Sequence, residues 1–127
     1  MRADLAQYGV EETRTPADVD RVLNAPGTTL MVINSVCGCA AGKARPGVGL
    51  ALRSSKRPDR AATVFAGGDD AAVAHVRGLL SMYPPSSPSV ALFKDGKPVY
   101  MMHRSEIEPR TAEQIAAVLE YAFEQHC

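Results

Sequence analysis

The chain has 127 residues with 14 basic and 14 acidic side chains, so its formal net charge at pH 7 is zero. Hydrophobic residues make up 46% and charged residues 22%, as is ordinary for a single globular domain spanning residues 1–127. The balanced charge gives no reason to expect nucleic acid or an anionic membrane as a partner. No apolar run approaches the length of about 20 residues that a membrane helix needs, and a signal-peptide core is absent from the N-terminal segment. We therefore expect a cytoplasmic protein without a membrane partner, in which the three cysteines are not a disulfide framework.

The first quarter of the chain predicts two strands with a helix between them. Residues 10–13 favour a short first strand. Thr15 as N-cap and Pro16 at the first helical position predict a helix that ends before Pro26. The apolar run over residues 30–33 is typical of a central strand that is buried on both faces.

Two cysteines follow this central strand in the segment Cys37-Gly38-Cys39. The small residues after them open a helix that runs toward Leu52, and Pro46 is expected to kink that helix. A cysteine between a strand end and a helix start lies where backbone N–H groups and the positive end of the helix dipole converge. Both favour thiolate over thiol. We therefore identify Cys37 as a candidate reactive sulfur.

The second half of the chain predicts three more strands and two more helices. The predicted elements are a strand over 61–66, a helix from 70 to 80, a strand over 89–94, a return strand over 97–104 and a final helix from 111. Asp95-Gly96 is a strong hairpin turn, and Thr111 with Gln114 forms a capping box. The prolines in residues 83–88 exclude regular structure there.

This order of strands and helices predicts an α/β fold with a central mixed sheet. Alternating strand and helix units favour parallel strands in the centre, and the hairpin adds antiparallel strands at one side. Helices are expected on both faces of the sheet.

The order of elements, with cysteines after the second strand, resembles the thioredoxin fold. Residues 88–96 are similar to the thioredoxin segment in which a cis-proline opens the fourth strand. The resemblance implies that Pro88 is cis and faces Cys37. The residues alone favour the opposite state for the peptide bond, because most X–Pro bonds are trans.

Residues 34–46, which contain the Cys-Gly-Cys motif, resemble the active-site segment of the bacilliredoxin family. The similarity runs from about Glu11 to the last helix. The resemblance implies removal of bacillithiol from mixed disulfides on oxidised or S-thiolated proteins, although some members look like disulfide isomerases. The partners would be those proteins and a low-molecular-weight thiol, with bacillithiol as co-substrate and no other cofactor. One departure is Ser105, where the family often carries histidine.

The chemistry predicted for this site is thiol–disulfide exchange. The Cys37 thiolate would attack the small thiol's sulfur in the mixed disulfide, and Gly38 would leave room for that sulfur. Cys39 either resolves the intermediate through a strained Cys37–Cys39 disulfide or only tunes Cys37. Pro88 would help to bind the substrate.

Two basic residues follow the cysteines and have two interpretations. Lys43 and Arg45 either attract the carboxylates of an anionic thiol such as bacillithiol or form a solvated helix face. Cys127, the last residue of this sequence, is expected to be a frayed-end thiol without a role.

Three other functions are alternatives to the bacilliredoxin interpretation. A general disulfide isomerase or reductase would use both Cys37 and Cys39, and a redox sensor would keep their disulfide without turnover. A metal-binding module would complete two cysteine ligands with further residues, namely His75, His103, His126 or Cys127. Because a lone Cys-X-Cys is half of a structural zinc site and no spacing brings the histidines together, we expect no metal.

Overall fold

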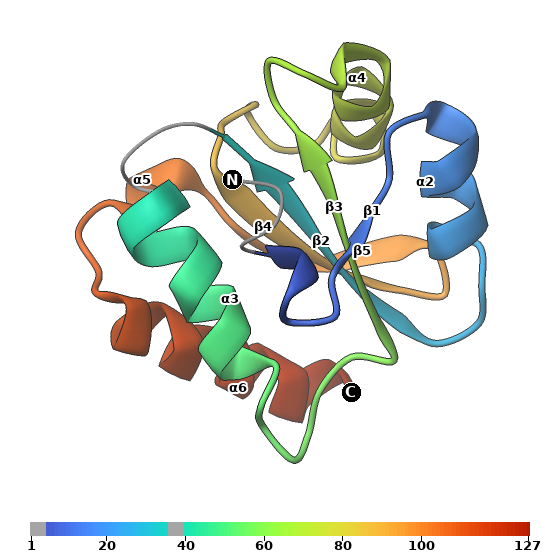
Figure 1. Cartoon of the computed structure of the whole chain (residues 1–127). Coiled ribbons are helices and arrows are strands. Elements are labelled where there is room, and N and C mark those ends of the chain that lie inside the picture. Colours follow the sequence, from blue (N-terminus) through green and yellow to red (C-terminus); the bar gives the residue numbers. More distant parts are fainter. Residues whose placement is uncertain (1–4, 36–39) are drawn as a thin grey trace.

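The computed structural model describes residues 5–35 and 40–127 (Figure 1). In chain order its elements are β1 (Glu11–Glu12), α2 (Pro16–Leu23), β2 (Thr28–Asn34), the π-helix η1 (Ala40–Ala44), α3 (Arg45–Ala51), β3 (Arg60–Phe65), α4 (Asp70–Leu79), β4 (Ser89–Lys94), β5 (Lys97–Met102), α5 (Arg104–Ile107) and α6 (Ala112–His126). Each strand and helix named above as a prediction is present, with ends that differ by a few residues. The α/β class is confirmed.

The sheet has five strands in the order β1-β3-β2-β4-β5. β3 runs parallel to both β1 and β2, whereas β4 runs antiparallel to β2 and β5. β2 therefore lies in the middle, where Met31 is the register partner of Ala62 on one side and of Ala91 on the other. All seven residues of β2 are buried, which confirms the predicted central strand.

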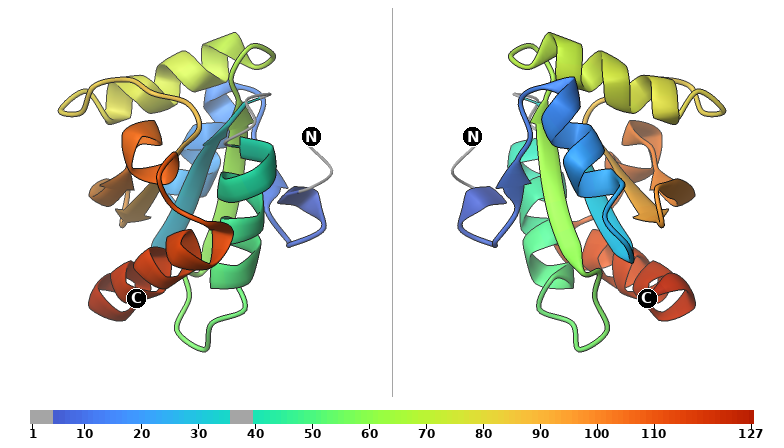
Figure 2. Two further views of the ribbon diagram at one scale, coloured as in Figure 1. Left: turned by 90° about the vertical axis from the view of Figure 1, so that its left-hand side faces the viewer. Right: turned by 90° about the vertical axis from the view of Figure 1, so that its right-hand side faces the viewer.

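Alternation along β2 divides the core between the two faces of the sheet. Leu30 and Val32 pack in a cluster with α3 and α6, while Met31 and Ile33 pack in a second cluster with α2 and α4. Figures 1 and 2 show these helix pairs on opposite faces of the sheet. Because successive side chains of a strand point to opposite faces, one continuous apolar run supplies both cores.

The helix after the cysteines changes type on the way to its predicted end. It begins as the π-helix η1 and continues as the α-helix α3, with Pro46 in the first turn of α3. Proline has no N–H to donate to the preceding turn, so an irregular turn just before Pro46 follows from its chemistry. Gly47 lets α3 approach α6 closely, since a Cβ there would lie 2.7 Å from Cγ2 of Ile115.

The predicted return strand is wrong at its end. β5 stops at Met102, and a short helix, α5, begins at Arg104. The cause is local: the carboxylate of Glu106 accepts a hydrogen bond from the backbone N–H of His103 at 3.2 Å, which starts a helical turn where the strand would have continued.

The final helix is capped as the sequence predicts. Thr111 Oγ1 accepts from the Gln114 N–H at 3.2 Å, and Gln114 Oε1 accepts from the Thr111 N–H at 2.9 Å. The buried side of α6 includes Ile115, Leu119 and Phe123. Among the helices built from described residues, none combines the length and the apolar character that crossing a membrane requires.

Candidate functional site

The predicted nucleophile lies outside the described residues. Cys37, Gly38 and Cys39 fall in the sequence between Ser35, the residue after β2, and Ala40, the first residue of η1. The elements on either side are thus the central strand and a helix, as the sequence predicts. The roles assigned to these three residues stay predictions.

Pro88 adopts the state that the resemblance implies. The Ser87–Pro88 peptide bond is cis, against the trans state that the residues alone favour. Pro88 immediately precedes β4, whose first residue, Ser89, is the register partner of Ile33 near the end of β2. The cis-proline therefore lies beside the end of the strand that leads to the cysteines. A contact between Pro88 and Cys37 stays a prediction.

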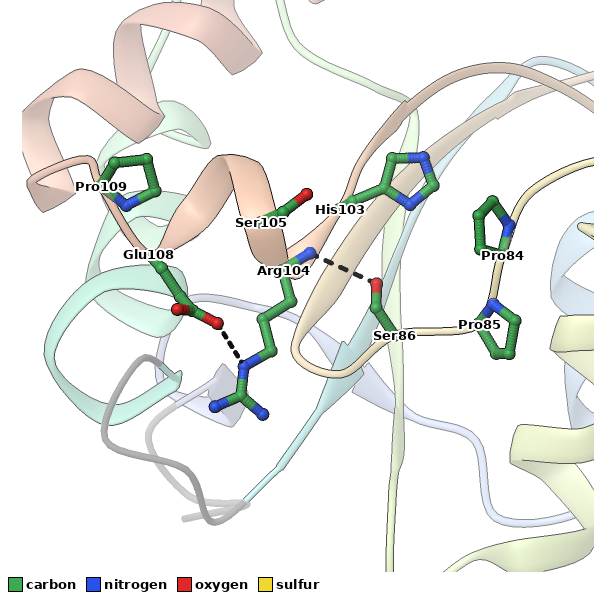
Figure 3. Close-up of a pocket in the computed structure, with 8 residues that line it drawn as sticks. All are labelled: Pro84, Pro85, Ser86, His103, Arg104, Ser105, Glu108 and Pro109. Atoms are coloured by element: carbon green, nitrogen blue, oxygen red, sulfur yellow. Dashed lines mark hydrogen bonds and ion pairs between the residues drawn. The ribbon is translucent and has the colours of Figure 1, made fainter.

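Hydrogen bonds from Arg104 hold the segment before Pro88 against α5 (Figure 3). The backbone N–H of Arg104 donates to Ser86 Oγ at 3.3 Å, and its guanidinium donates to the Ser87 carbonyl at 3.3 Å. The guanidinium also pairs with the Glu108 carboxylate, with 2.7 Å between Nε and Oε1. These bonds connect α5 to both residues that precede Pro88, so Arg104 positions the cis-proline segment.

Lys43 and Arg45 differ in their surroundings. The ammonium of Lys43 donates to the backbone carbonyl of Glu108, which joins η1 to the end of α5. Arg45, at the start of α3, is only 3% exposed. Arg45 is therefore not part of a solvated helix face. Attraction of a thiol's carboxylates by either residue stays a prediction.

An open cavity of about 810 Å³ lies between α5 and the segment that leads to Pro88 (Figure 3). We call it the Arg104 cavity; its lining residues are Pro84, Pro85, Ser86, His103, Arg104, Ser105, Glu108 and Pro109. Ser105, where the resemblance led us to expect histidine, is one of them. The imidazole of His103 packs edge-on against Tyr83, with 5.5 Å between the ring centres. The cavity offers hydroxyl, imidazole and guanidinium groups to a polar ligand.

The histidines considered as metal ligands lie on separate elements. His75 of α4 pairs with Asp20 of α2, with 2.6 Å between Nε2 and Oδ1. His103 precedes α5, and His126 ends α6. Within residues 5–35 and 40–127, no three histidine, cysteine, aspartate or glutamate residues come together as a metal site would require. Cys127 is exposed.

Solved structures with the same arrangement of elements are thioredoxins and their relatives. An oxidoreductase with a thioredoxin fold matches with a TM-score of 0.71 at 13% identity, over 90% of this chain and 96% of that one. A thioredoxin variant from Halobacterium salinarum matches with a TM-score of 0.67 at 15% identity, over 94% of this chain and 91% of the other. The fold is therefore thioredoxin-like, as the order of elements predicted.

Sequence comparison narrows the class further. The profile of the family described as "Disulphide isomerase" matches residues 1–127. A bacilliredoxin from Koribacter versatilis is 51% identical over 100% of this chain and 88% of its own length. A bacilliredoxin from Geobacillus kaustophilus is 48% identical over 99% of this chain and 87% of its own length. The chain belongs to this disulphide isomerase family, among its bacilliredoxins. It is a thiol–disulfide oxidoreductase, and protein thiols are its general class of substrate.

Sequence reasoning missed most of the Arg104 cavity. It selected His103 only as a possible metal ligand, and it did not select Ser86, Arg104 or Glu108. The spacing of three residues between His103 and Glu106 was an available signal for α5, because a carboxylate at that spacing often caps a helix start. The contacts of Arg104 with Ser86 and Ser87 join segments that are distant in the sequence, and no local pattern shows them.

Proposed function

We propose that this protein removes bacillithiol from protein mixed disulfides in the cytoplasm, with Cys37 as the nucleophile. The observation that carries the proposal is membership among the bacilliredoxins, in a thioredoxin-like fold that places the Pro88 segment beside the end of β2, the strand that leads to Cys37. Membership among the bacilliredoxins supports bacillithiol as the small thiol. No other cofactor enters the proposed reaction.

The first step is a disulfide exchange in which no electrons are gained or lost overall. The Cys37 thiolate attacks the bacillithiol sulfur of the mixed disulfide and forms a new S–S bond to it. The bond between bacillithiol and the protein breaks, and the protein sulfur leaves as a thiolate that takes a proton from water. The protein substrate is then restored, and Cys37 carries bacillithiol.

The second step frees Cys37. The thiolate of a second bacillithiol attacks the bacillithiol sulfur on Cys37, which releases bacillithiol disulfide and the Cys37 thiolate. Alternatively, Cys39 attacks Cys37, releases bacillithiol and leaves a Cys37–Cys39 disulfide for an external thiol to reduce. Only the second route requires Cys39.

Four further residues would bind or position the substrate. Gly38 would leave space beside the nucleophile, and Pro88 would line the approach to it. Lys43 and Arg45 supply positive charge after the cysteines for the carboxylates of the thiol. Because Arg45 is 3% exposed, we assign it an effect through the local field, whereas Lys43 is the residue for direct contact.

The family description favours a second candidate function, which is dithiol isomerisation or reduction of protein disulfides. In that reaction Cys37 attacks a protein disulfide, and Cys39 releases the enzyme from the mixed disulfide when rearrangement stalls. Loss of Cys39 would then block net reduction and would slow isomerisation, because stalled mixed disulfides on Cys37 would accumulate.

Release of bacillithiol by single-cysteine variants tests the proposal. A bacillithiol-modified protein is incubated with excess bacillithiol and with wild type, Cys37→Ser, Cys39→Ser or the matched control Cys127→Ser. We expect wild type, Cys39→Ser and Cys127→Ser to restore the substrate thiol, and Cys37→Ser to leave it blocked. Restoration by Cys37→Ser would refute the nucleophile assignment. Failure of Cys39→Ser alone would favour the isomerase or reductase.

A further inference from the structure

A second, smaller cavity of about 290 Å³ lies next to the Arg104 cavity. We call it the Arg77 cavity; its lining residues are Ile33, Arg77, Leu80, Ser81, Tyr83, Pro84, Pro85, Ser86 and Met101. Pro84, Pro85 and Ser86 line both cavities and therefore form a wall between them. Figure 3 shows these three residues on the segment that faces α5. Two compartments thus flank the segment that leads to the cis-proline.

The position of the Arg77 cavity connects it with the candidate active site. Ile33 lies one residue before the end of β2 and is the register partner of Ser89, the residue after Pro88. Met101 lies on β5, and Leu80 follows the end of α4. Ile33, Leu80 and Met101 are buried and belong to one apolar cluster, so this cavity has an apolar floor.

Arg77 brings a positive charge to this apolar cavity. Its Nε is buried and has no hydrogen-bond acceptor among residues 5–35 and 40–127. No ion pair of its guanidinium is found with that part of the chain. Arg104 on the other side of the wall, by contrast, is paired with the Glu108 carboxylate. A buried hydrogen-bond donor without an acceptor costs free energy. A ligand that brings an acceptor to a cationic group beside apolar walls therefore binds favourably there.

We infer that the Arg77 cavity binds an acidic side chain of the protein substrate, close to the cysteine that carries the small thiol. The inference rests on the proposed function and names the part of the substrate that this site recognises. A glutamate fits both the apolar floor and the charged group of this cavity. Its methylene groups can pack on the apolar residues, and its carboxylate can pair with the guanidinium of Arg77.

The small thiol itself fits the neighbouring cavity better. The Arg104 cavity is the larger one, at about 810 Å³ against about 290 Å³. Both linings include two serines, but only the Arg104 cavity adds an imidazole and the Arg104–Glu108 ion pair. Its groups suit a polar ligand, whereas the Arg77 cavity suits a single side chain with a charged end. The two halves of a mixed disulfide would then lie on opposite sides of the wall.

Matched peptides test the inference. Each peptide carries one cysteine in a mixed disulfide with bacillithiol and a single glutamate at one of the three positions on either side, and its control has glutamine there. Wild type, Arg77→Gln, Arg77→Lys and Arg77→Glu are compared by kcat/KM for peptide thiol release. Arg53→Gln, which changes an exposed arginine beyond the end of α3, is the matched control. Thermal unfolding checks that each variant is folded.

For at least one position, we expect wild type to prefer the glutamate peptide about tenfold, the lower end of the effect of a hydrogen bond to a charged group. Arg77→Gln should abolish the preference, while Arg77→Lys and Arg53→Gln should keep it. Arg77→Glu should reverse it, so that the glutamine peptide becomes the better substrate. The effect of the Arg77 variants should appear in KM rather than in kcat, whereas Arg53→Gln should keep both constants at the wild-type values.

Three results would overturn the inference. The first is a wild type that does not distinguish glutamate from glutamine at any position. The second is an Arg77→Gln variant that weakens all peptides equally, since this would mean a structural role. The third is an Arg77→Gln variant that weakens binding of bacillithiol disulfide itself, which would mean that the cavity holds the small thiol.

Failure of the proposed function is distinguishable from failure of this inference. If wild type released no bacillithiol from any peptide, the proposed function would fail. The same glutamate and glutamine peptides, joined through a disulfide to a neutral thiol, would still show whether Arg77 selects the acidic side chain. A preference that is lost in Arg77→Gln would support the cavity assignment, and no preference would overturn it.

Discussion

Replacing Gly47 by alanine should destabilise the protein by forcing α3 away from α6. A Cβ at this position would lie 2.7 Å from Cγ2 and 2.9 Å from Cβ of Ile115, and 3.2 Å from the Ala112 carbonyl oxygen. Ile115 is fully buried, and its branched side chain has few alternative rotamers, so it cannot move aside without displacing the helix. Such overpacking costs about 1–3 kcal/mol.

The intrinsic preference of a helix for alanine opposes this cost. Replacing glycine by alanine in a helix interior stabilises the helix by about 1 kcal/mol. The free energy of unfolding of Gly47→Ala should therefore fall by a net amount of about 1 kcal/mol, which lowers the melting temperature by about 4 °C in a domain of this size.

Gly78→Ala is the matched control, because Gly78 lies in α4 and a Cβ there would have no neighbour within 4 Å. This variant should gain about 1 kcal/mol. Urea denaturation of both variants measures the difference in free energy of unfolding, which should be about 2 kcal/mol at equal m-values. Equal stability of the two variants would refute the argument that close contact between α3 and α6 requires glycine at position 47.

Two further predictions concern two basic residues and the half-buried phenol of Tyr100. Arg45→Ala should lower the free energy of unfolding by about 2 kcal/mol, because its 3% exposed side chain would leave a cavity. Lys43→Ala, which removes a surface contact with the Glu108 carbonyl, should cost less than about 1 kcal/mol in the same urea experiment. Equal losses would contradict the difference in burial. Burial raises the pKa of Tyr100, and the negative charge of Glu106 raises it further. Tyr100 should therefore make its full contribution to the free energy of unfolding below the unfolded pKa of about 10. That contribution should be lost as the pH rises through the pKa of Tyr100 in the folded protein. Absorbance titration should show one of the four tyrosines ionising late, and Tyr100→Phe should remove that late phase. A late phase that persists in Tyr100→Phe would mean that another tyrosine is responsible.

The elements that sequence reasoning located well have local causes. Thr15 caps α2 by accepting from the Asp18 N–H, as an N-cap threonine should. Asp95 and Gly96 both have positive φ, at 51° and 81°, which is the conformation that a two-residue hairpin turn requires. The apolar run that became β2 was recognisable because a strand covered on both faces needs no polar alternation.

The features that sequence reasoning missed depend on contacts between distant residues. Arg45 looks like a surface residue in the sequence, yet the packing around α3 buries it. The Arg77 cavity needs Ile33, Arg77 and Met101 from three separate elements. The cis state of Pro88 followed only from resemblance, because the local preference of the peptide bond points to trans.

The intact mass of Cys39→Ala after incubation with a bacillithiol-modified protein tests the central claim most directly. This variant keeps the proposed nucleophile and lacks the neighbouring thiol, so an adduct formed in the first step cannot be resolved within the site. We predict one bacillithiol adduct on Cys37, located by peptide mapping, with an equal amount of substrate thiol released. A folded Cys39→Ala protein that forms no adduct, while wild type reduces ordinary protein disulfides, would contradict the bacilliredoxin mechanism and favour the dithiol isomerase or reductase.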